Sequence, residues 1–195
     1  DFMARTAAAA GMAALGAKPL LAAAPAAAAR LPKMTIATWK GPAKLDGADL
    51  QKAAVKLTEQ AISAIGGLKR FIGRGAVVWV KPNIGWDRTP ELAANTNPDV
   101  VATIVRLCFD AGAKTVKVGD NSCDIPTKCY QSSGIPAAVR PLGAEVILLD
   151  RSRVRETSIK GERVKSIPMF PAILESDLVI NVPIVKHHRL TTSTL

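Results

Sequence analysis

Side chains that can bind an anion or move a proton gather late in the printed sequence. Residues 177–181 form a run of branched apolar residues typical of a strand buried on both faces, and a Lys-His-His-Arg run follows at 186–189. A lysine can neutralise a carboxylate or a phosphate, and a histidine can act as an acid, a base or a metal ligand. We therefore predict a site that includes Lys186 and His188.

Other apolar runs also end in polar residues. Lys81 and Asn83 follow 76–80, Asp120 and Asn121 follow 115–119, and Asp150 follows 145–149. Because the carboxyl ends of parallel strands meet at one edge of a sheet, these side chains should converge. We predict catalytic roles for Lys186, His188 and Asp120, and binding of a ligand or cofactor by Lys81, Asn83 and Asn121. The alternative is ordinary turns and solvated strand ends, because Gly-Asp-Asn is a common turn sequence.

The spacing of apolar residues predicts the elements that position these side chains. Short apolar runs predict strands at 34–39, 76–80, 115–119, 145–149 and 177–181, and helical periodicity predicts long helices over 49–68 and from Asn97-Pro98 to Gly112. Shorter helices are expected at 126–133, 135–142 and 171–176, and a basic hairpin at 151–165. The alternation favours an α/β fold with a doubly wound, mostly parallel sheet of the Rossmann-like, three-layer type.

The first thirty residues are rich in alanine and contain Lys18, Pro19 and Pro25. This composition argues against a membrane-spanning helix and favours an export signal with small-residue cleavage sites at 24–29. Residues 1–3 resemble the part of a twin-arginine signal that follows its two arginines. We expect a partial signal at 1–30, a mature α/β domain at 31–195, passage through the twin-arginine translocase and a periplasmic or otherwise exported location. A disordered Ala/Pro extension is the alternative.

The formal net charge of +10 favours small anionic ligands or anionic surfaces as partners. With only 4% aromatic residues and no zinc-finger or RNA-recognition signature, the sequence argues against a nucleic-acid partner. It contains no Walker loop, GxGxxG or GxSxG motif, so nucleotide-phosphate binding and serine hydrolysis lack their usual signals.

The cysteines do not have the spacing of a ferredoxin cluster. Cys108 lies on the apolar face of a predicted helix, and Cys123 and Cys129 lie after the predicted strand 115–119, where they could be a disulfide or two free thiols. Two adjacent histidines are a weak signal for zinc, and we predict no metal ligands. An iron-sulfur cluster could come only from further sequence or from a partner.

Four segments together resemble the DUF362 family, a domain of unknown function. They are VVWVKPNIGW at 77–86, the Asn-Thr-Asn-Pro run at 95–98, AGAKTVKVGDNS at 111–122 and SDLVINVPIVKHHRLTTSTL at 176–195. The family pattern marks Lys81, Asn83, Asp120, Lys186, His188 and Thr194, so Thr194 joins the predicted binding residues on the resemblance alone. Because family members continue further, we expect the chain to be part of a longer protein.

The resemblance implies little about activity. Some relatives carry a ferredoxin-like module and some carry a twin-arginine signal, which suggests redox work or a cofactor. We therefore expect an exported enzyme that is redox-associated or binds an anion or cofactor at the strand ends. The alternative is a non-catalytic binding or assembly protein of the cell envelope that uses the basic hairpin.

Overall fold

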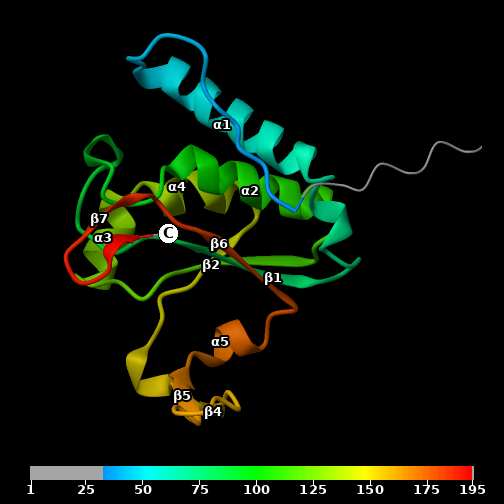
Figure 1. Cartoon of the computed structure of the whole chain (residues 1–195), viewed down its shortest axis with the longest axis vertical. Coiled ribbons are helices and arrows are strands. Elements are labelled where there is room, and N and C mark those ends of the chain that lie inside the picture. The colour runs from blue at the N-terminus through cyan, green and yellow to red at the C-terminus, as the bar shows by residue number, and fades with distance from the viewer. Residues whose placement is uncertain (1–32, 195) are drawn as a thin grey trace, which may run out of the picture. The chain divides into compact units, whose positions relative to one another are not determined.

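The computed structural model describes residues 33–194, so the predicted export signal at 1–30 lies outside the described residues. A four-stranded parallel sheet contains β1 (Val77–Pro82), β2 (Thr115–Val118), β3 (Glu145–Val146) and β6 (Leu178–Val182). The strands lie in the order β3-β2-β1-β6 (Figure 1). The predicted α/β class with a parallel, doubly wound sheet is confirmed.

The order of the strands reverses direction at β1. From β1 the chain adds β2 and then β3 on one side, and later it adds β6 on the other side. In an open α/β sheet, the loops that leave the two strands at such a reversal diverge, and a crevice forms beyond their carboxyl ends. The loops after β1 and β6 are therefore the expected place for a ligand.

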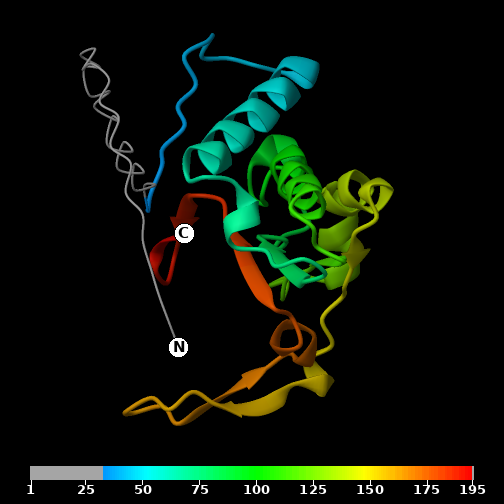
Figure 2. The same ribbon diagram turned by 90° about the vertical axis from the view of Figure 1, so that its right-hand side faces the viewer.

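The core lies between the sheet and α2 (Pro98–Asp110), which packs against β1 and β2. Val78 and Val80 of β1 and Val101 and Val105 of α2 are fully buried. α4 (Ile135–Val139) and α1 (Gly47–Ala64) pack on α2. α5 (Pro171–Leu174) lies on the other side of the sheet (Figures 1 and 2). Alternate strand residues point to the same face of a sheet, so Val78 and Val80, two positions apart on β1, belong to the same core.

α2 begins where the sequence predicts. The side-chain oxygen of Asn97 accepts hydrogen bonds from the backbone N–H groups of Asp99 and Val100, at 2.8 and 3.2 Å. Pro98 occupies the first helical position, where no backbone donor is needed. This cap fixes the end of the long loop that leaves β1.

α1 ends at Ala64, earlier than the predicted residue 68. The N–H of Gly66 donates to the Ser63 carbonyl at 2.8 Å, and the N–H of Gly67 donates to the Ile62 carbonyl at 2.9 Å. Both glycines have positive φ, 91° and 76°. This pair of bonds is a Schellman motif, which ends the helix. The apolar stripe in the sequence continues to residue 68, so the pattern alone predicts a longer helix than the one that forms. A 3-10 turn, η1 (Leu68–Arg70), follows.

The predicted strand at 34–39 is wrong. These residues are extended but have no strand partner within 33–194, and the Thr35 hydroxyl donates instead to the Ala61 carbonyl of α1 at 2.9 Å. Met34 and Ile36 are exposed. An apolar run with strand character forms a strand only where a neighbouring strand supplies hydrogen bonds, and here the segment lies along a helix.

The predicted strand at 145–149 pairs only at Glu145 and Val146. The N–H of Ile147 still donates to the Val118 carbonyl at 2.9 Å, but the carbonyl of Ile147 accepts the Tyr130 hydroxyl of α3 (Pro126–Ser132). β3 ends here because the Ile147 carbonyl accepts a hydrogen bond from the Tyr130 side chain and not from the backbone of a neighbouring strand. A 3-10 turn, η3 (Arg140–Leu142), precedes β3 where a helix to 142 was predicted.

Two hairpins leave this framework. A basic hairpin forms as predicted, but its strands are β4 (Arg155–Ser158) and β5 (Ser166–Met169), so it extends beyond the predicted bounds of 151–165. Lys160 in its turn has a φ of 53°. The second hairpin, β7 (Lys186–His188) and β8 (Thr192–Thr194), was not predicted. It folds the Lys-His-His-Arg run back on itself beyond β6.

Candidate functional site

A cavity of about 500 Å³ opens at the point where the strand order reverses. Its lining comes from the loop after β1, the loop after β2 and the hairpin β7–β8. The lining residues are Trp86, Arg88, Ala94, Cys123, Lys186, His187, His188, Arg189 and Leu190. The structure therefore brings two of the predicted catalytic residues, Lys186 and His188, to the edge of the sheet where the sequence places them.

The cavity is strongly basic. Arg88, Lys186 and Arg189 line it together with the two histidines, and among residues 33–194 no acidic side chain lines it. The Lys186 ammonium donates a hydrogen bond to the Ala94 carbonyl. Burial lowers the pKa of Lys186, and the neighbouring Cys123 and Asp120 oppose that shift. A cavity with this lining attracts an anion, because several cations share one space without a matching negative charge.

His188 has one ring nitrogen committed to its own hairpin. Its Nδ1 accepts the backbone N–H groups of Leu190 and Thr191, both at 3.2 Å. Because Nδ1 accepts, we assign the neutral tautomer with the proton on Nε2. In this state His188 offers a hydrogen-bond donor to an anion at the cavity wall.

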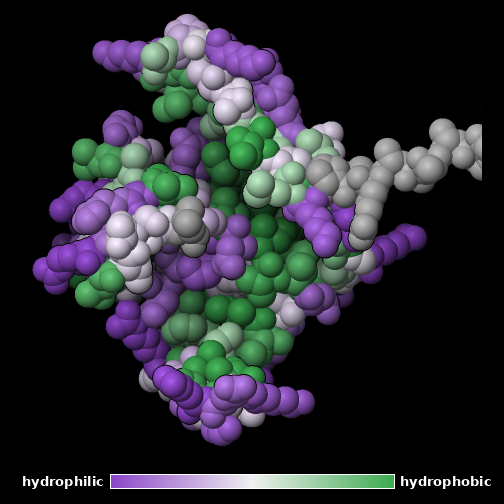
Figure 3. All heavy atoms as spheres, in the orientation of Figure 1, coloured by the Kyte–Doolittle hydropathy of each residue, from purple (hydrophilic) through white to green (hydrophobic). Residues whose placement is uncertain are grey.

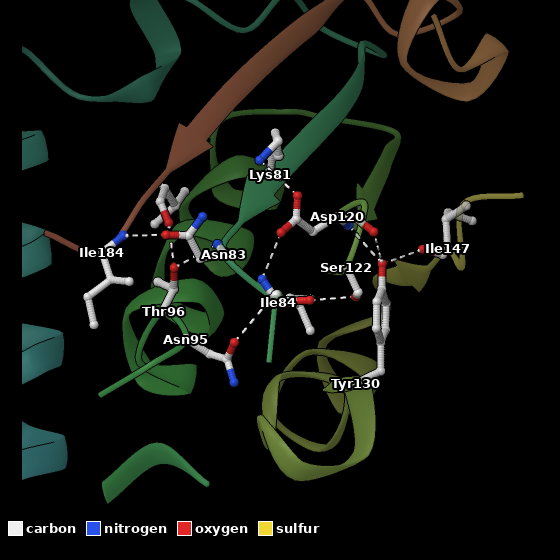
Figure 4. A network of polar contacts seen from close by, with 12 residues as sticks. Lys81, Asn83, Ile84, Asn95, Thr96, Asp120, Ser122, Tyr130, Ile147 and Ile184 are labelled. Atoms are coloured by element: carbon white, nitrogen blue, oxygen red, sulfur yellow. Dashed lines mark hydrogen bonds and ion pairs between the residues drawn. The ribbon is translucent and has the colours of Figure 1, made fainter. Parts of the chain in front are cut away.

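Asp120 and Lys81 form an ion pair beside the cavity (Figure 4). The Lys81 Nζ lies 2.8 Å from Oδ1 of Asp120, and Oδ2 accepts the backbone N–H of Ile84 at 2.9 Å. Asp120 is only 7% exposed. Because both carboxylate oxygens are engaged, Asp120 ties the loop after β2 to the loop after β1. Its catalytic role stays a prediction, and the geometry supports a positioning role.

Asn83 ties the loop after β1 to the segment after β6. Its Oδ1 accepts the N–H of Ile184 at 3.2 Å, and its own N–H donates to the Thr96 hydroxyl at 2.9 Å. That hydroxyl donates in turn to the Val182 carbonyl at 2.7 Å (Figure 4). Thr194 donates to the Ile184 carbonyl from the other strand of the hairpin. Two of the four predicted binding residues, Asn83 and Thr194, thus hold the hairpin that carries Lys186.

Tyr130 is a buried hydroxyl that the sequence reasoning missed. It accepts the Asp120 N–H at 2.7 Å and lies within donating distance of the Asp120 and Ile147 carbonyls, at 3.0 and 2.9 Å. Burial raises the pKa of Tyr130 to about 12, which keeps it a neutral donor. It is the single tyrosine of the chain, and that rarity was the available signal.

Gly119 permits this arrangement by having no side chain. A Cβ at this position would lie 2.7 Å from the Ile147 carbonyl and 2.9 Å from the Trp79 ring. The glycine of the Gly-Asp-Asn run is therefore required for close packing at the end of β2, and not only for a turn. Trp79 is fully buried, and its indole N–H has no hydrogen-bond partner within residues 33–194.

Asn121 does not line the cavity. Its side-chain oxygen accepts a hydrogen bond from the Arg151 guanidinium at 2.9 Å, and the same guanidinium donates to the Ser122 carbonyl at 2.8 Å. Asp150 caps the 3-10 turn η4 (Arg151–Arg153) by accepting the Ser152 N–H at 2.9 Å. Asn121 and Asp150 thus hold the start of the segment that leads to β4, which is a structural role at the strand ends.

Asn95 shapes the part of the cavity that comes from the loop after β1. Its oxygen accepts the N–H groups of Gly85 and Trp86 at 3.0 and 3.1 Å, and its amide donates to the Trp86 and Arg88 carbonyls at 2.9 and 3.1 Å. Asn95 is 2% exposed, so these bonds satisfy a buried amide. The sequence motifs include Asn95 and Trp86 but not Arg88.

The cysteines are all free thiols. Cys123 is exposed at the cavity, whereas Cys129 is buried in the core, so the disulfide considered from the sequence is not formed. Burial raises the pKa of Cys129 and raises that of Cys108 to about 12. Within residues 33–194 no group of three or more His, Cys, Asp or Glu side chains is arranged to hold a metal ion.

The fold and the cavity define an α/β protein with a basic crevice beyond the carboxyl ends of its central strands. The model of the family "Domain of unknown function (DUF362)" matches residues 78–195, more than half of the chain, and the chain belongs to this family. The resemblance drawn from the sequence motifs is thereby confirmed.

A curated relative is the thylakoid-associated protein sll1697 of Synechocystis sp. (strain ATCC 27184 / PCC 6803 / Kazusa), which is 23% identical over 134 residues. The match covers 69% of this chain and 41% of the relative, so the chain spans less than half of the relative's length. The relative's name states a location and no activity. No solved structure matches the chain. Among the described residues, no helix has the length and apolar character needed to cross a membrane.

Proposed function

We propose that the protein binds a small anion of the carboxylate or phosphate class in the cavity beyond β1, β2 and β6. The observation that carries this proposal is the lining, in which Arg88, Lys186 and Arg189 face one space with no acidic residue among the described lining residues. Charge-assisted hydrogen bonds from such groups contribute about 1.5–3 kcal/mol each. A volume of about 500 Å³ fits a small organic ligand rather than a bare ion.

The residues have different tasks in this proposal. Lys186 and Arg189 meet the charge of the ligand, and His188 donates from Nε2 to one of its oxygens. Trp86, which is 43% exposed, offers an apolar surface to the rest of the ligand. Asp120, Lys81, Asn83 and Thr194 hold the three loops in place.

Binding can be tested on the full chain by titration with succinate, a dicarboxylate, and with inorganic phosphate. Calorimetry gives the affinity, and a fluorescence change that is lost in Trp86→Phe, which keeps the other two tryptophans, reports on the cavity. The variant Lys186→Gln/Arg189→Gln should bind the better of the two anions at least tenfold more weakly, because each lost charge-assisted bond exceeds the roughly 1.4 kcal/mol that a tenfold change requires.

The matched control removes the same charge elsewhere. Lys160→Gln/Arg163→Gln lies in the turn of the hairpin β4–β5, far from the lining residues in sequence, and should keep the affinity unchanged. A second variant, Arg88→Gln/Arg189→Gln, leaves the Lys186 bond to Ala94 intact and should also lose affinity. Equal affinities in the cavity variants and the control would refute the proposal.

The pH dependence gives an independent check. An anion binds the charged ammonium of Lys186, so affinity for succinate should fall as the pH rises through the pKa of this lysine. Burial lowers that pKa from its ordinary value of 10.5, so the loss should begin at a lower pH than for an exposed lysine. Lys186→Arg should remove this loss, since arginine keeps its charge.

Export and redox association complete the proposal. The composition of residues 1–30 supports export, and the redox association rests only on what the resemblance to some DUF362 relatives implies. Fractionation of cells, with sequencing of the mature N-terminus, tests export: a mature protein that begins near Arg30 outside the cytoplasm supports it, and an unprocessed cytoplasmic chain refutes it. Visible absorption and iron analysis of the full-length, anaerobically purified protein test the redox association, and colourless, iron-free protein would refute a role that depends on a cluster.

A further inference from the structure

The basic hairpin β4–β5 stands apart from the packed part of the fold. Figure 2 shows it as a two-stranded ribbon that extends away from the sheet and the helices. Arg155 pairs with Met169, and Ser158 pairs with Ser166, and each strand packs mainly on the other. A two-stranded hairpin is at best marginally stable by itself in water, so a hairpin of this kind calls for a surface to rest on.

The two faces of the hairpin differ in character. Because side chains alternate along a strand, Thr157 and Ile159 lie on the same face as Ile167 and Met169. The opposite face carries Glu156, Ser158 and Ser166, and the Ser166 hydroxyl donates to Glu156 at 2.9 Å. The first face also carries Arg155, opposite Met169, and Lys165, opposite Ile159, so it combines apolar side chains with cations.

Apolar side chains are also exposed at the tip. Ile159 and Val164, on either side of the turn, are 45% and 54% exposed. Figure 3 shows hydrophilic and hydrophobic side chains next to each other at the end of the molecule where Figure 1 labels β4 and β5. No residue within 33–194 covers this tip, and burying exposed branched apolar side chains is favourable in water.

The charge of the segment identifies what it can rest on. Residues 151–169 contain six basic residues and two acidic ones, and five of the basic residues remain when Arg151, which binds Asn121 and Ser122, is set aside. A second copy of the hairpin would carry the same surplus and be repelled. The complementary surface is a negatively charged one.

We propose that the hairpin β4–β5 binds the surface of an anionic membrane. Ile159 and Val164 enter the headgroup layer, and Arg155, Lys160, Arg163 and Lys165 bind lipid phosphates around them. An apolar tip ringed by cations is the pattern by which peripheral segments bind anionic lipids, because the apolar side chains and the cations meet different layers of one surface. This inference is independent of the anion cavity.

Sedimentation of the full chain with vesicles tests the proposal. We expect binding to vesicles of phosphatidylcholine mixed with phosphatidylglycerol, no binding to phosphatidylcholine alone, and weaker binding at high salt. A basic residue near an anionic surface contributes roughly fivefold in affinity, so Lys160→Gln/Arg163→Gln/Lys165→Gln should weaken binding about 100-fold. Ile159→Ser/Val164→Ser should weaken it separately, because the apolar part is lost.

The matched control removes three exposed lysines from other parts of the chain, Lys44→Gln/Lys56→Gln/Lys69→Gln, and should keep most of the binding. Succinate affinity of the cavity, measured on the same hairpin variants, shows that the rest of the domain is folded. If the hairpin and control variants lose binding equally, or if the wild-type chain ignores anionic vesicles, the proposal is overturned. Binding to polyglutamate without binding to vesicles would overturn it in favour of an acidic protein partner.

Discussion

Replacing Asp120 with asparagine removes one charge and little volume at the centre of the polar network. Its Oδ2 accepts the Ile84 N–H at 2.9 Å, and its Oδ1 lies 2.8 Å from the Lys81 ammonium. An asparagine side chain has one oxygen and one NH2 group, so it can accept from only one of these two donors. The other donor is then left facing a second donor in a site where Asp120 is 7% exposed.

The expected loss of stability follows from the exposure of each partner. Losing a charged hydrogen bond to a buried backbone N–H costs about 1.5–3 kcal/mol. The Lys81 side chain is 39% exposed, so solvent screens the ion pair and its share is about 0.2–1 kcal/mol. We expect Asp120→Asn to lower the free energy of unfolding by about 2–3 kcal/mol.

Urea unfolding of the full chain, followed by circular dichroism, measures this change. Asp110→Asn is the matched control, because Asp110 is 59% exposed and its one ion pair among residues 33–194 is with Arg106, so its loss should be below about 0.5 kcal/mol. A double-mutant cycle with Lys81→Met separates the ion pair from the backbone bond. If Asp120→Asn and Asp110→Asn destabilise equally, Asp120 does not tie the two loops and the network has been misinterpreted.

Three further changes examine the same region. Tyr130→Phe should cost about 1–3 kcal/mol in urea unfolding, because the Asp120 N–H and two carbonyls lose a buried partner; no loss would mean that this hydroxyl is not needed. Gly119→Ala should cost about 1–3 kcal/mol by overpacking against the Ile147 carbonyl, and a neutral result would contradict the close approach at this glycine. Under native conditions Cys123 should react with a thiol reagent well before Cys108 and Cys129, since those two are buried and their pKa values are raised. Cys123→Ser should remove the fast phase of the reaction. A fast phase that persists would show that a buried cysteine becomes accessible to the reagent.

The fold was predictable wherever a few neighbouring residues determine a helix or a strand. The Asn97-Pro98 start of α2 depends on a cap within three residues, and valines at successive positions of β1 mark a strand buried on both faces. The strand predicted at 34–39 failed because strand formation depends on a neighbour that sequence periodicity does not contain. The hairpin β7–β8 was missed for a related reason: Thr192 turns with a φ of 70°, and no glycine or asparagine marks that turn.

The candidate site was predictable as a region but not as a set of roles. Parallel strands bring their carboxyl ends together, so polar residues after β1, β2 and β6 had to meet at one edge of the sheet. Which of them face a cavity depends on what packs over each strand end. Asp120 became buried because Tyr130 and Ile84 lie against it, and those contacts join residues 10 and 36 positions apart.

Burial at the strand ends separates two kinds of polar residue. Side chains whose partners are backbone groups hold the loops in place: Asp120 and Asn83 reach another loop, and Asn95 braces its own. Cations farther along the same loops, such as Arg88 and Arg189, are exposed and line the cavity. Exposed cations can be displaced toward a ligand at small cost, whereas the buried groups would lose hydrogen bonds that nothing replaces. Hydrogen-bonded polar groups beneath exposed cations are suited to binding anions that differ in shape, and this is the physical reason to begin ligand searches with dicarboxylates and phosphates of several sizes.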